Sequence, residues 1–477
     1  MSSSPDDGAG HTHTHTRTHT HTHTKNPSGR LRVGLVHAAF EGVQIFVGGV
    51  GTAIRGQIGA LPAVQRALAN QGVELTPHFI EPAYLPAHPH YDEKSSTHHR
   101  ERIRETGGTF SVVPSGTTGL AADAVWGDPG LGELRNWQIA SAALAGRLID
   151  LASRYDSLVA YCHEPVFAFA PVHTSLQAEA AGVDITAVYV SHATAFAHEM
   201  PLPNPDRLMA ESLPVHWAKI SPGVRLGSIS HYMSRHLITD YGANPDTFVP
   251  TRNGVDTTDH WYRRRSSAEL SGLLTRHGVP VDRDLLVTFG RGVPYKRHDM
   301  LIRAAARTRR RAHPVIMSDT ELPEVRALAA RSQVDATFIT SFDRELMASL
   351  LQWGRTRVCS LSAENEPWGL IPMEARLLAR HGGAVLVTAD SGGFSEQVAD
   401  GIDGFLHMPN DPAHLAGVID QVLGLPEDER ARIRGDAAKR VLDREAWPVK
   451  IMESLRATVP GIDAVADAAL RELRAVP

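Results

Sequence analysis

The sequence predicts an α/β protein made of two doubly wound, Rossmann-like parallel sheets that face each other across a cleft. Two observations carry this fold class. Short runs rich in Val, Ile and Leu alternate with helical-looking segments along most of the chain, and a continuous apolar run is typical of a parallel strand buried on both faces. In addition, 477 residues exceed what one hydrophobic core usually supports, so two domains are expected.

The expected strands fall into two groups along the chain. Within each group the apolar runs are separated by segments long enough for a crossover helix, which favours a parallel sheet in each half. The first group is LRVGLVHAAF, VELTPHFI, SLVAYCHEP, ITAVYVSHAT and VRLGSISHYM, and the second is LLVTFGRG, HPVIMSDT, ATFITSF, TRVCSLSAE and GGAVLVTADSGG.

The predicted domain boundaries follow from breaks in this alternation. Residues 1–29, which include HTHTHTRTHTHTHT, have no apolar periodicity and are expected to be a disordered tail. The first domain is predicted at residues 30–256 and the second at residues 257–446, because the stretch after TRNGVD is polar and irregular. Residues 447–477 are expected to be helical, broken at Pro460-Gly461, and to pack back toward the first domain.

The composition limits which kinds of binding partner and which cellular compartment we expect. A formal charge of −5, with 42% hydrophobic and 21% charged residues, favours neither nucleic acid nor an anionic membrane as a partner. No run is long and apolar enough for a membrane span, and the N-terminus has no signal-peptide core. Cys162 and Cys359 lie outside any CxxC pattern, so we expect reduced thiols and a cytoplasmic protein. The oligomeric state is not predicted.

Polar residues follow the predicted strands at the point where each strand ends. In open α/β sheets the ligand lies outside the carboxyl ends of the strands. Polar groups at this edge in both halves therefore predict a ligand held between two facing domains. These groups are His37, His163-Glu164, Ser191-His192, Arg291, Ser318-Asp319, Glu364 to Glu366, and Asp390-Ser391-Gly392.

The segment VGGVGTAIRGQI is a first candidate for binding phosphate. Its glycines lead into a predicted helix, whose N-terminus offers free N–H groups and a partial positive charge. A plain turn is the alternative. The spacing is not a dinucleotide fingerprint, because G-x-G-x-x-G would need glycine at Ile54, so an NAD dehydrogenase is disfavoured.

A second phosphate candidate is TFGRGVPYKRHDMLIRAA. Here a predicted strand runs into Arg291 and Lys296; an arginine fork and a mobile lysine charge together suit a diphosphate. A D-x-D pattern, Asp282 and Asp284, comes before this strand rather than after it. It therefore predicts a turn, and no metal site is expected.

The segment ENEPWGLIPME holds two carboxylates. Pro372 is placed to begin a helix, which puts Glu374 in the first turn, while Glu366 lies in the preceding loop. Two carboxylates separated by a loop and a helix start can reach different parts of one elongated ligand. A paired acid and base would need carboxyl groups ~5 to 9 Å apart, which the sequence does not establish.

At these residues the chain resembles the retaining GT-B glycosyltransferases of family 4 and their glycogen-synthase-like relatives. ENEPWGLIPMEA is similar to the E-x7-E motif of that family, GRGVPYKRHDMLIRAA to its Arg/Lys segment, and SGGFSEQVADGIDGFL to the motif that follows. In the first half, GGVGT, YVSHATA and TRNGVD are similar to the glycine loop, the histidine after a strand and the P-N-G-V-D of the family. The resemblance covers about residues 31 to 425.

The resemblance implies a nucleotide-diphosphate sugar as co-substrate, no other cofactor, and a small polar acceptor. By position, Glu374 would bind the ribose, Glu366 the transferred sugar, and Arg291 with Lys296 the diphosphate. The implied catalytic residues are His192, Glu366, Arg291 and Lys296. The implied donor-binding residues are Gly49, Val50, Gly51, Arg291, Lys296, Glu366, Trp368, Gly369, Leu370 and Glu374; the implied acceptor-binding residues are His163, Glu164 and His192.

The chain also departs from the family pattern. Phenylalanine is more usual where Trp368 stands, and Pro62 is expected to interrupt the helix after the glycine loop. Residues 81–136 match no family motif and are expected to form the acceptor side.

The implied mechanism is same-face attack, with the departing phosphate oxygen taking the proton of the acceptor, because no carboxylate nucleophile is evident. Other hypotheses stay open: a glycoside phosphorylase or a nucleotide-sugar epimerase of the same fold, and a non-catalytic protein that binds nucleotide sugars.

Overall fold

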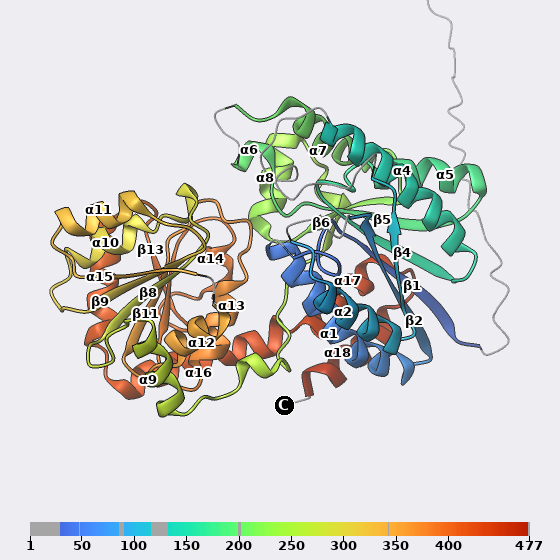
Figure 1. Cartoon of the computed structure of the whole chain (residues 1–477). Helices are drawn as coiled ribbons and strands as arrows, with labels where there is room; N and C mark the ends of the chain where they lie inside the picture. Colours follow the sequence, from blue (N-terminus) through green and yellow to red (C-terminus); the bar gives the residue numbers. More distant parts are fainter. Residues whose placement is uncertain are drawn as a thin grey trace, which may run out of the picture.

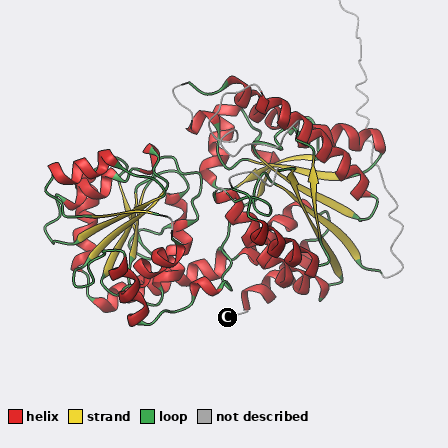
Figure 2. Ribbon diagram, viewed as in Figure 1, coloured by secondary structure: helices red, strands yellow, loops and turns green. Residues whose placement is uncertain are grey.

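The computed structural model describes two lobes, each a sheet covered by helices on both faces (Figures 1 and 2). The predicted tail lies outside the described residues, apart from Gly29. The structure describes residues 29–475 except Val47, residues 85–89, residues 116–131, residues 199–201 and Phe342.

The first lobe is built on a parallel sheet with the strand order β3-β2-β1-β4-β5-β6-β7. Each of the five apolar runs predicted in the first half contains one of these strands. Two short strands, β3 and β7, were missed by the sequence pattern; β3 is half exposed and β7 spans only three residues. The strands are β1 (Leu31–Ala38), β2 (Val73–Pro82), β3 (Thr109–Val113), β4 (Ser157–His163), β5 (Ile185–Val190), β6 (Val224–Ser228) and β7 (Phe248–Pro250).

The second lobe is built on a parallel sheet with the strand order β10-β9-β8-β11-β12-β13. All five predicted runs are strands here too, and the short β13 is the one that the pattern missed. Strands β8 and β9 are buried along their whole length, which explains their continuous apolar sequence. The strands are β8 (Leu285–Gly290), β9 (His313–Ser318), β10 (Thr337–Thr340), β11 (Thr356–Leu361), β12 (Val385–Ala389) and β13 (Phe405–His407).

In each sheet the chain first adds strands on one side of a central strand and then continues on its other side. These two switch points position the site. In the first sheet the chain goes from β1 outward to β2 and returns to β4 on the other side of β1; in the second, β8 and β11 are related in the same way. Such switch points open a crevice at the carboxyl ends of the two central strands. His37 and His163 lie at the ends of β1 and β4, and Arg291 and Glu364 follow β8 and β11.

Two helical layers cover the first sheet. Helices α4, α5 and α7 pack together on one face, and α1, α17 and α18 pack together on the other (Figure 1). The C-terminal helices α17 and α18, separated by Pro460-Gly461, thus lie against the first lobe. The helices of this lobe are α1 (Gly49–Ala69), α2 (Glu93–Glu105), α4 (Gly132–Ala152), α5 (Ala170–Ala181), α6 (Ala195–His198), α7 (Pro205–Trp217), α8 (His231–Tyr241), α17 (Trp447–Thr458) and α18 (Asp463–Ala475).

The expectation that Pro62 interrupts the helix after the glycines is wrong. Helix α1 runs through Pro62 without a break. Proline removes one backbone hydrogen bond from a helix interior, but the buried residues on both sides of it, Ile58, Leu61 and Val64, hold α1 against the core. Tertiary packing outweighs the local preference here.

The helices of the second lobe alternate with its strands. The predicted helix start at Pro372 is confirmed: α13 begins at Ile371, and Glu374 lies in its first turn. The helices are α9 (Ser267–Arg276), α10 (Asp299–Ala305), α11 (Pro323–Arg331), α12 (Arg344–Gln352), α13 (Ile371–Ala379), α14 (Phe394–Gln397), α15 (Pro412–Gly424) and α16 (Glu427–Arg444).

The chain crosses between the lobes twice, and the two crossings pair with each other. The N–H of Val255 donates to the carbonyl of Glu445 (2.8 Å), and the N–H of Trp447 donates to the carbonyl of Val255 (3.1 Å). Gly254 permits this approach, because a Cβ there would lie 2.8 Å from the Glu445 oxygen. The domain boundaries given above stay a prediction; the paired crossings lie close to two of them.

The carboxyl edges of the two sheets face each other. Arg252, which follows β7, has its guanidinium 5.9 Å from the ring of Trp368, which follows β11. The main chain at the start of α8 is hydrogen-bonded to a side chain of α14. No helix in the described ranges is both long and apolar enough to cross a membrane.

Candidate active site

Lys296 and Glu366 form an ion pair at the switch point of the second sheet. The ammonium of Lys296 lies 2.5 Å from Oε2 of Glu366, and both side chains are largely buried. Burial lowers the pKa of Lys296, but the charge of Glu366 and the interaction with Tyr295 outweigh it, so the pKa is raised and the lysine stays charged. Lys296 and Glu366, which were predicted to bind different parts of one ligand, therefore contact each other directly.

The loop that carries Glu366 is packed against the two glycines that follow β12. The N–H of Gly393 donates to the carbonyl of Glu366 (2.7 Å). A Cβ on Gly392 would lie 2.4 Å from that carbonyl oxygen, and Gly392 has a φ of +59°. Glycine is needed here for both space and conformation. The segments ENEPWG and SGGF therefore contact each other directly.

Trp368, Gly369 and Leu370 link this loop to the start of α13. The Trp368 side chain is buried, so only its main chain is available for the ligand contact implied by the resemblance. Gln397 donates to the carbonyl of Gly369 (3.1 Å) and also to that of Trp368. The carbonyls thus point into the protein, while Leu370 is the N-cap of α13, where N–H groups have no helical partner.

Glu374 has a different environment from Glu366 and a different charged partner. Its carboxylate is buried, which raises its pKa, and Nη2 of Arg344 lies 3.7 Å from Oε1.

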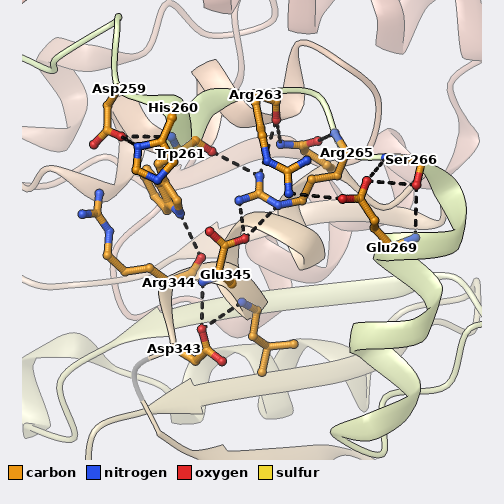
Figure 3. Close-up of polar contacts among 12 residues, drawn as sticks. Asp259, His260, Trp261, Arg263, Arg265, Ser266, Glu269, Asp343, Arg344 and Glu345 are labelled. Carbon is orange, nitrogen blue, oxygen red and sulfur yellow. Dashed lines mark hydrogen bonds and ion pairs between the residues drawn. The ribbon is translucent and has the colours of Figure 1, made fainter.

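Arg344 is a candidate that the sequence patterns missed. Its guanidinium lies 4.1 Å from the centre of the Trp261 ring, and its carbonyl accepts from Nε1 of Trp261 (3.1 Å). Figure 3 shows the surrounding network, in which Arg265 pairs with Glu345 while the Arg344 guanidinium extends away from it. Arg344 follows the N-cap Asp343 and has no motif of its own, because only the fold brings it to Glu374.

Arg291 is exposed, and its side chain has no carboxylate partner among the described residues. Its neighbour Gly292 donates an N–H to Asp319, which follows β9 (2.7 Å). The loop that carries Arg291 is thus anchored to the residue that follows β9. We found no group of three or more His, Cys, Asp or Glu within the described ranges that could hold a metal ion.

Three histidines are stacked at the carboxyl edge of the first sheet. The rings of His37 and His163 are 5.9 Å apart, those of His163 and His192 are 5.0 Å apart, and Nδ1 of His163 shares a hydrogen bond of 2.7 Å with Nε2 of His192. Burial lowers the pKa of His37 to about 3 and that of His192 to about 4, and lowers that of His163 as well. The stack is therefore uncharged at neutral pH.

A small cavity of about 30 Å³ lies beside this stack, between β1, β4, α1 and α17. Both ring nitrogens of His37, Nε2 of His163 and Oε1 of Gln57 are buried and have no hydrogen-bond partner among the residues that the structure describes. The cavity is large enough for water and too small for a sugar. His192 is partly exposed, whereas His37 and His163 are buried; contact between His192 and an acceptor stays a prediction.

Glu164 lies beneath the loop that carries His192. Its Oε1 accepts from the N–H groups of His192 (3.1 Å) and Ala193 (2.7 Å), and the residue is 1% exposed. Arg207 lies 3.5 Å from it and also pairs with Glu211 (2.7 Å). One guanidinium thus serves two buried carboxylates, and burial raises the pKa of both. In this structure Glu164 supports the His192 loop from below; direct contact with an acceptor stays a prediction.

The predicted glycine loop is the first turn of α1. The helix begins at Gly49, so the N–H groups of Gly49, Val50 and Gly51 have no partner within the helix. The carboxylate of Glu41 accepts from the N–H of Gly48 (2.7 Å), and a Cβ on Gly51 would lie 2.8 Å from it. Sequence reasoning did not single out Glu41, which lacks a motif.

Glu81 is another buried carboxylate of the first lobe. It accepts from the N–H groups of Val43 (2.6 Å) and Gln44 (2.8 Å). Burial raises its pKa to about 7, against the lowering effect of these hydrogen bonds. Glu81 therefore fixes the backbone that leads to the glycine turn.

A family model described as "Glycosyl transferases group 1" matches residues 274–440, which cover most of the second lobe. Among curated proteins, a D-inositol 3-phosphate glycosyltransferase from Frankia alni is 30% identical over 218 residues, 43% of this chain and 51% of the relative. An alpha-1,3/1,6-mannosyltransferase alg-2 from Neurospora crassa is 35% identical over 123 residues, 26% of this chain and 25% of the relative. The chain thus spans about half the length, or less, of these curated relatives.

The similarity to solved structures covers both lobes. Anabaena HepE, solved in complex with UDP and glucose, superposes with a TM-score of 0.56 at 16% identity, over 87% of this chain and 96% of that one. A sucrose-phosphate synthase from Thermosynechococcus elongatus gives a TM-score of 0.61 at 15% identity, over 93% and 98% of the two chains. At this identity the likeness establishes the fold. The fold is thus of the GT-B type, and the match to the glycosyltransferase family model is confined to residues 274–440.

Proposed function

We propose that the chain transfers a hexose from a nucleoside-diphosphate sugar to a small polar acceptor, with retention at the anomeric carbon and without a metal ion. The observation that carries this proposal is the Lys296–Glu366 ion pair, 2.5 Å long, at the switch point of the second sheet and near the exposed Arg291. A cation held by a carboxylate beside a free guanidinium suits a sugar that is attached to a diphosphate.

In this proposal the second lobe stabilises the charge that develops on the departing diphosphate. Arg291 and Lys296 supply the positive charge, and each preorganised donor of this kind is worth about 2.7 to 4 kcal/mol. Glu366 accepts from hydroxyls of the transferred sugar while Lys296 holds its carboxylate. Glu374 accepts from the ribose hydroxyls, and the adjacent Arg344 orients it.

The first lobe takes the acceptor in this proposal. His192 is uncharged at neutral pH, since burial lowers its pKa to about 4. Its Nε2 shares a hydrogen bond with His163, so Nδ1 is the ring nitrogen left to donate to or accept from a hydroxyl, depending on the tautomer. Glu164 is tied to backbone N–H groups and Arg207 and is not positioned as a base. The departing phosphate oxygen therefore takes the acceptor proton, and attack occurs on the face that the diphosphate leaves.

The curated relatives named for D-inositol 3-phosphate support a phosphorylated polyol as the acceptor class. Anabaena HepE, solved with UDP and glucose and with UDP-glucose, supports a uridine diphosphate donor.

Release of nucleoside diphosphate from UDP- and GDP-hexoses, with inositol phosphates and free polyols as acceptors, tests the proposal. We expect Lys296→Ala and Glu366→Ala to abolish release while the proteins stay folded. Lys439→Ala is the matched control, because Lys439 forms an ion pair of the same length with Asp443 on the exposed side of α16. Equal loss in all three variants, or no loss in any, would overturn the assignment.

Two further measurements separate the finer parts of the proposal. An α-linked product from an α-linked donor, observed by NMR, supports retention, and inversion contradicts it. Activity that is unchanged by EDTA supports a reaction without metal. Sugar release that needs inorganic phosphate and no nucleotide would indicate a phosphorylase instead.

A further inference from the structure

Glu396 belongs to the second lobe, but its carboxylate contacts the first. It lies in the four-residue helix α14. Its Oε2 accepts from the N–H of His231 (2.8 Å) and its Oε1 from the N–H of Tyr232 (2.7 Å). These are the first two residues of α8. A carboxylate at a helix N-terminus satisfies N–H groups that have no helical partner and interacts favourably with the helix dipole.

The same short helix is fixed to the loop that carries Glu366. Gln397, the residue after Glu396, donates to the carbonyl of Gly369 (3.1 Å). Gly393, the residue before α14, donates its N–H to the carbonyl of Glu366 (2.7 Å). Adjacent residues of α14 thus bind the first lobe on one side and the Glu366 loop on the other.

Arg252, on the crossing between the lobes, supports this contact. Its Nη2 lies 2.6 Å from Nε2 of His231 and 4.0 Å from Oε2 of Glu396. Its guanidinium also lies over the ring of Trp368. The side chain of Glu396 is 14% exposed, so water competes little for these hydrogen bonds.

We propose that Glu396 is a positioning residue that couples the docking of α8 to the conformation of the Glu366 loop. This inference rests on the proposed function, because the loop then holds the sugar that must meet an acceptor on the first lobe. When the lobes separate, Glu396 loses both hydrogen bonds, and α14 keeps only its contacts within the second lobe, such as those from Arg376 to the carbonyl of Gln397 and from Arg440 to the carbonyl of Glu396. The loop is in its working conformation only when the lobes are docked.

A purely structural role for Glu396 makes a different prediction, and Glu269 provides the comparison. Glu269 also accepts hydrogen bonds at the start of a helix, from the N–H (2.7 Å) and hydroxyl (2.9 Å) of Ser266 before α9. That contact lies within one lobe. Glu269→Ala is therefore the matched control: it removes a capping carboxylate without touching the interface between the lobes.

The first test measures the distance between the lobes without turnover. Spin labels are placed at Ile220→Cys and Ile402→Cys, which are 72% and 57% exposed, while Cys162 and Cys359 are fully buried and stay unlabelled. With UDP bound, we expect a narrow distance distribution for the parent protein and for Glu269→Ala. For Glu396→Ala we expect a broader distribution with longer distances, and for Glu396→Gln, which keeps one acceptor oxygen, an intermediate result.

The second test compares binding with turnover. For Glu396→Ala we expect kcat to fall about tenfold, the scale of lost hydrogen bonds to a charged group, while the Kd for UDP stays within about twofold. An unchanged distance distribution, or a kcat equal to that of Glu269→Ala, would overturn the inference. Failure to release nucleoside diphosphate from any donor would overturn the proposed function alone, because the distance measurement requires no reaction.

Discussion

The carboxyl edges of the two sheets are built from opposite kinds of polar group. At the second sheet, Lys296 and Glu366 form an ion pair near the exposed guanidinium of Arg291. At the first sheet, His163 and His192 are uncharged and share a hydrogen bond behind the cleft. The carboxyl edge of one sheet thus carries charged groups, and the carboxyl edge of the other carries neutral donors and acceptors.

This difference indicates a division of labour. Charged side chains at a crevice suit a ligand that is itself an anion, whereas neutral imidazoles suit hydroxyl groups. The charges of the first lobe have a different use: the buried Glu164 and Arg207 support the backbone that carries His192. We therefore expect that removing charge will cost stability in the first lobe and ligand binding in the second.

The largest expected effect is the loss of Arg207. Arg207→Met leaves Glu164 and Glu211 buried together without a cation. Removing one partner of a buried ion pair typically costs about 3 to 5 kcal/mol. We expect the free energy of unfolding, measured by chemical denaturation, to fall by this amount.

Arg432→Met is the matched control for that prediction. Arg432 also pairs with two carboxylates, those of Glu429 and Asp436, but on the exposed surface of α16. Exposed pairs contribute about 0 to 1 kcal/mol, so the change should be small. Equal effects of the two substitutions would mean that the buried ion pairs of Arg207 stabilise the first lobe no more than an exposed pair does.

Most of the fold could be predicted from the sequence, because buried parallel strands leave a strong local signal. All ten apolar runs contain strands. Two of the missed strands, β7 and β13, are three residues long and too short to show a pattern, and the other, β3, is half exposed. The continuity of α1 through Pro62 depends on packing from other elements, which no local signal carries.

The candidate site was predictable in the second lobe to a larger extent than in the first. Lys296 and Glu366 belong to motifs, and the structure brings them into contact. Glu164 also stands at a strand end, but its carboxylate turns beneath the next loop. Arg344 and Glu396 depend on which segments meet in space, so their contacts could not be derived from spacing alone. The ligand roles of all these residues stay predictions.

The next expected effect concerns Arg291, which should behave in the opposite way to Arg207. It is exposed and has no carboxylate partner within the described ranges, so Arg291→Ala should leave the free energy of unfolding unchanged. Loss of a charge-assisted contact to phosphate should weaken UDP binding by about 1.5 to 3 kcal/mol. Isothermal titration measures this change.

Arg331→Ala is the control for Arg291, because Arg331 is an exposed arginine at the end of α11 in the same lobe. We expect it to bind UDP as the parent protein does. If both variants lost affinity equally, the effect would come from the overall charge of the lobe. If neither did, Arg291 would not contact the diphosphate.

The smallest expected effect concerns the pH dependence of stability at Glu81. Burial raises its pKa from 4.5 to about 7, so between these values the folded protein binds a proton that the unfolded chain does not. The stability from this residue is present below pH 4.5 and is lost as pH rises through 7. Between pH 6 and 7 the parent should lose about 1 kcal/mol that Glu81→Gln does not lose.

Denaturation curves at several pH values measure this difference. Glu429→Gln is the control, because the hydrogen bond from Arg432 lowers the pKa of Glu429 and its carboxylate stays charged across this range in both states. Its profile should run parallel to that of the parent. A Glu81→Gln profile that was also parallel would mean that Glu81 is ionised in the folded protein. The contrast between the two lobes would then rest on the histidine stack alone.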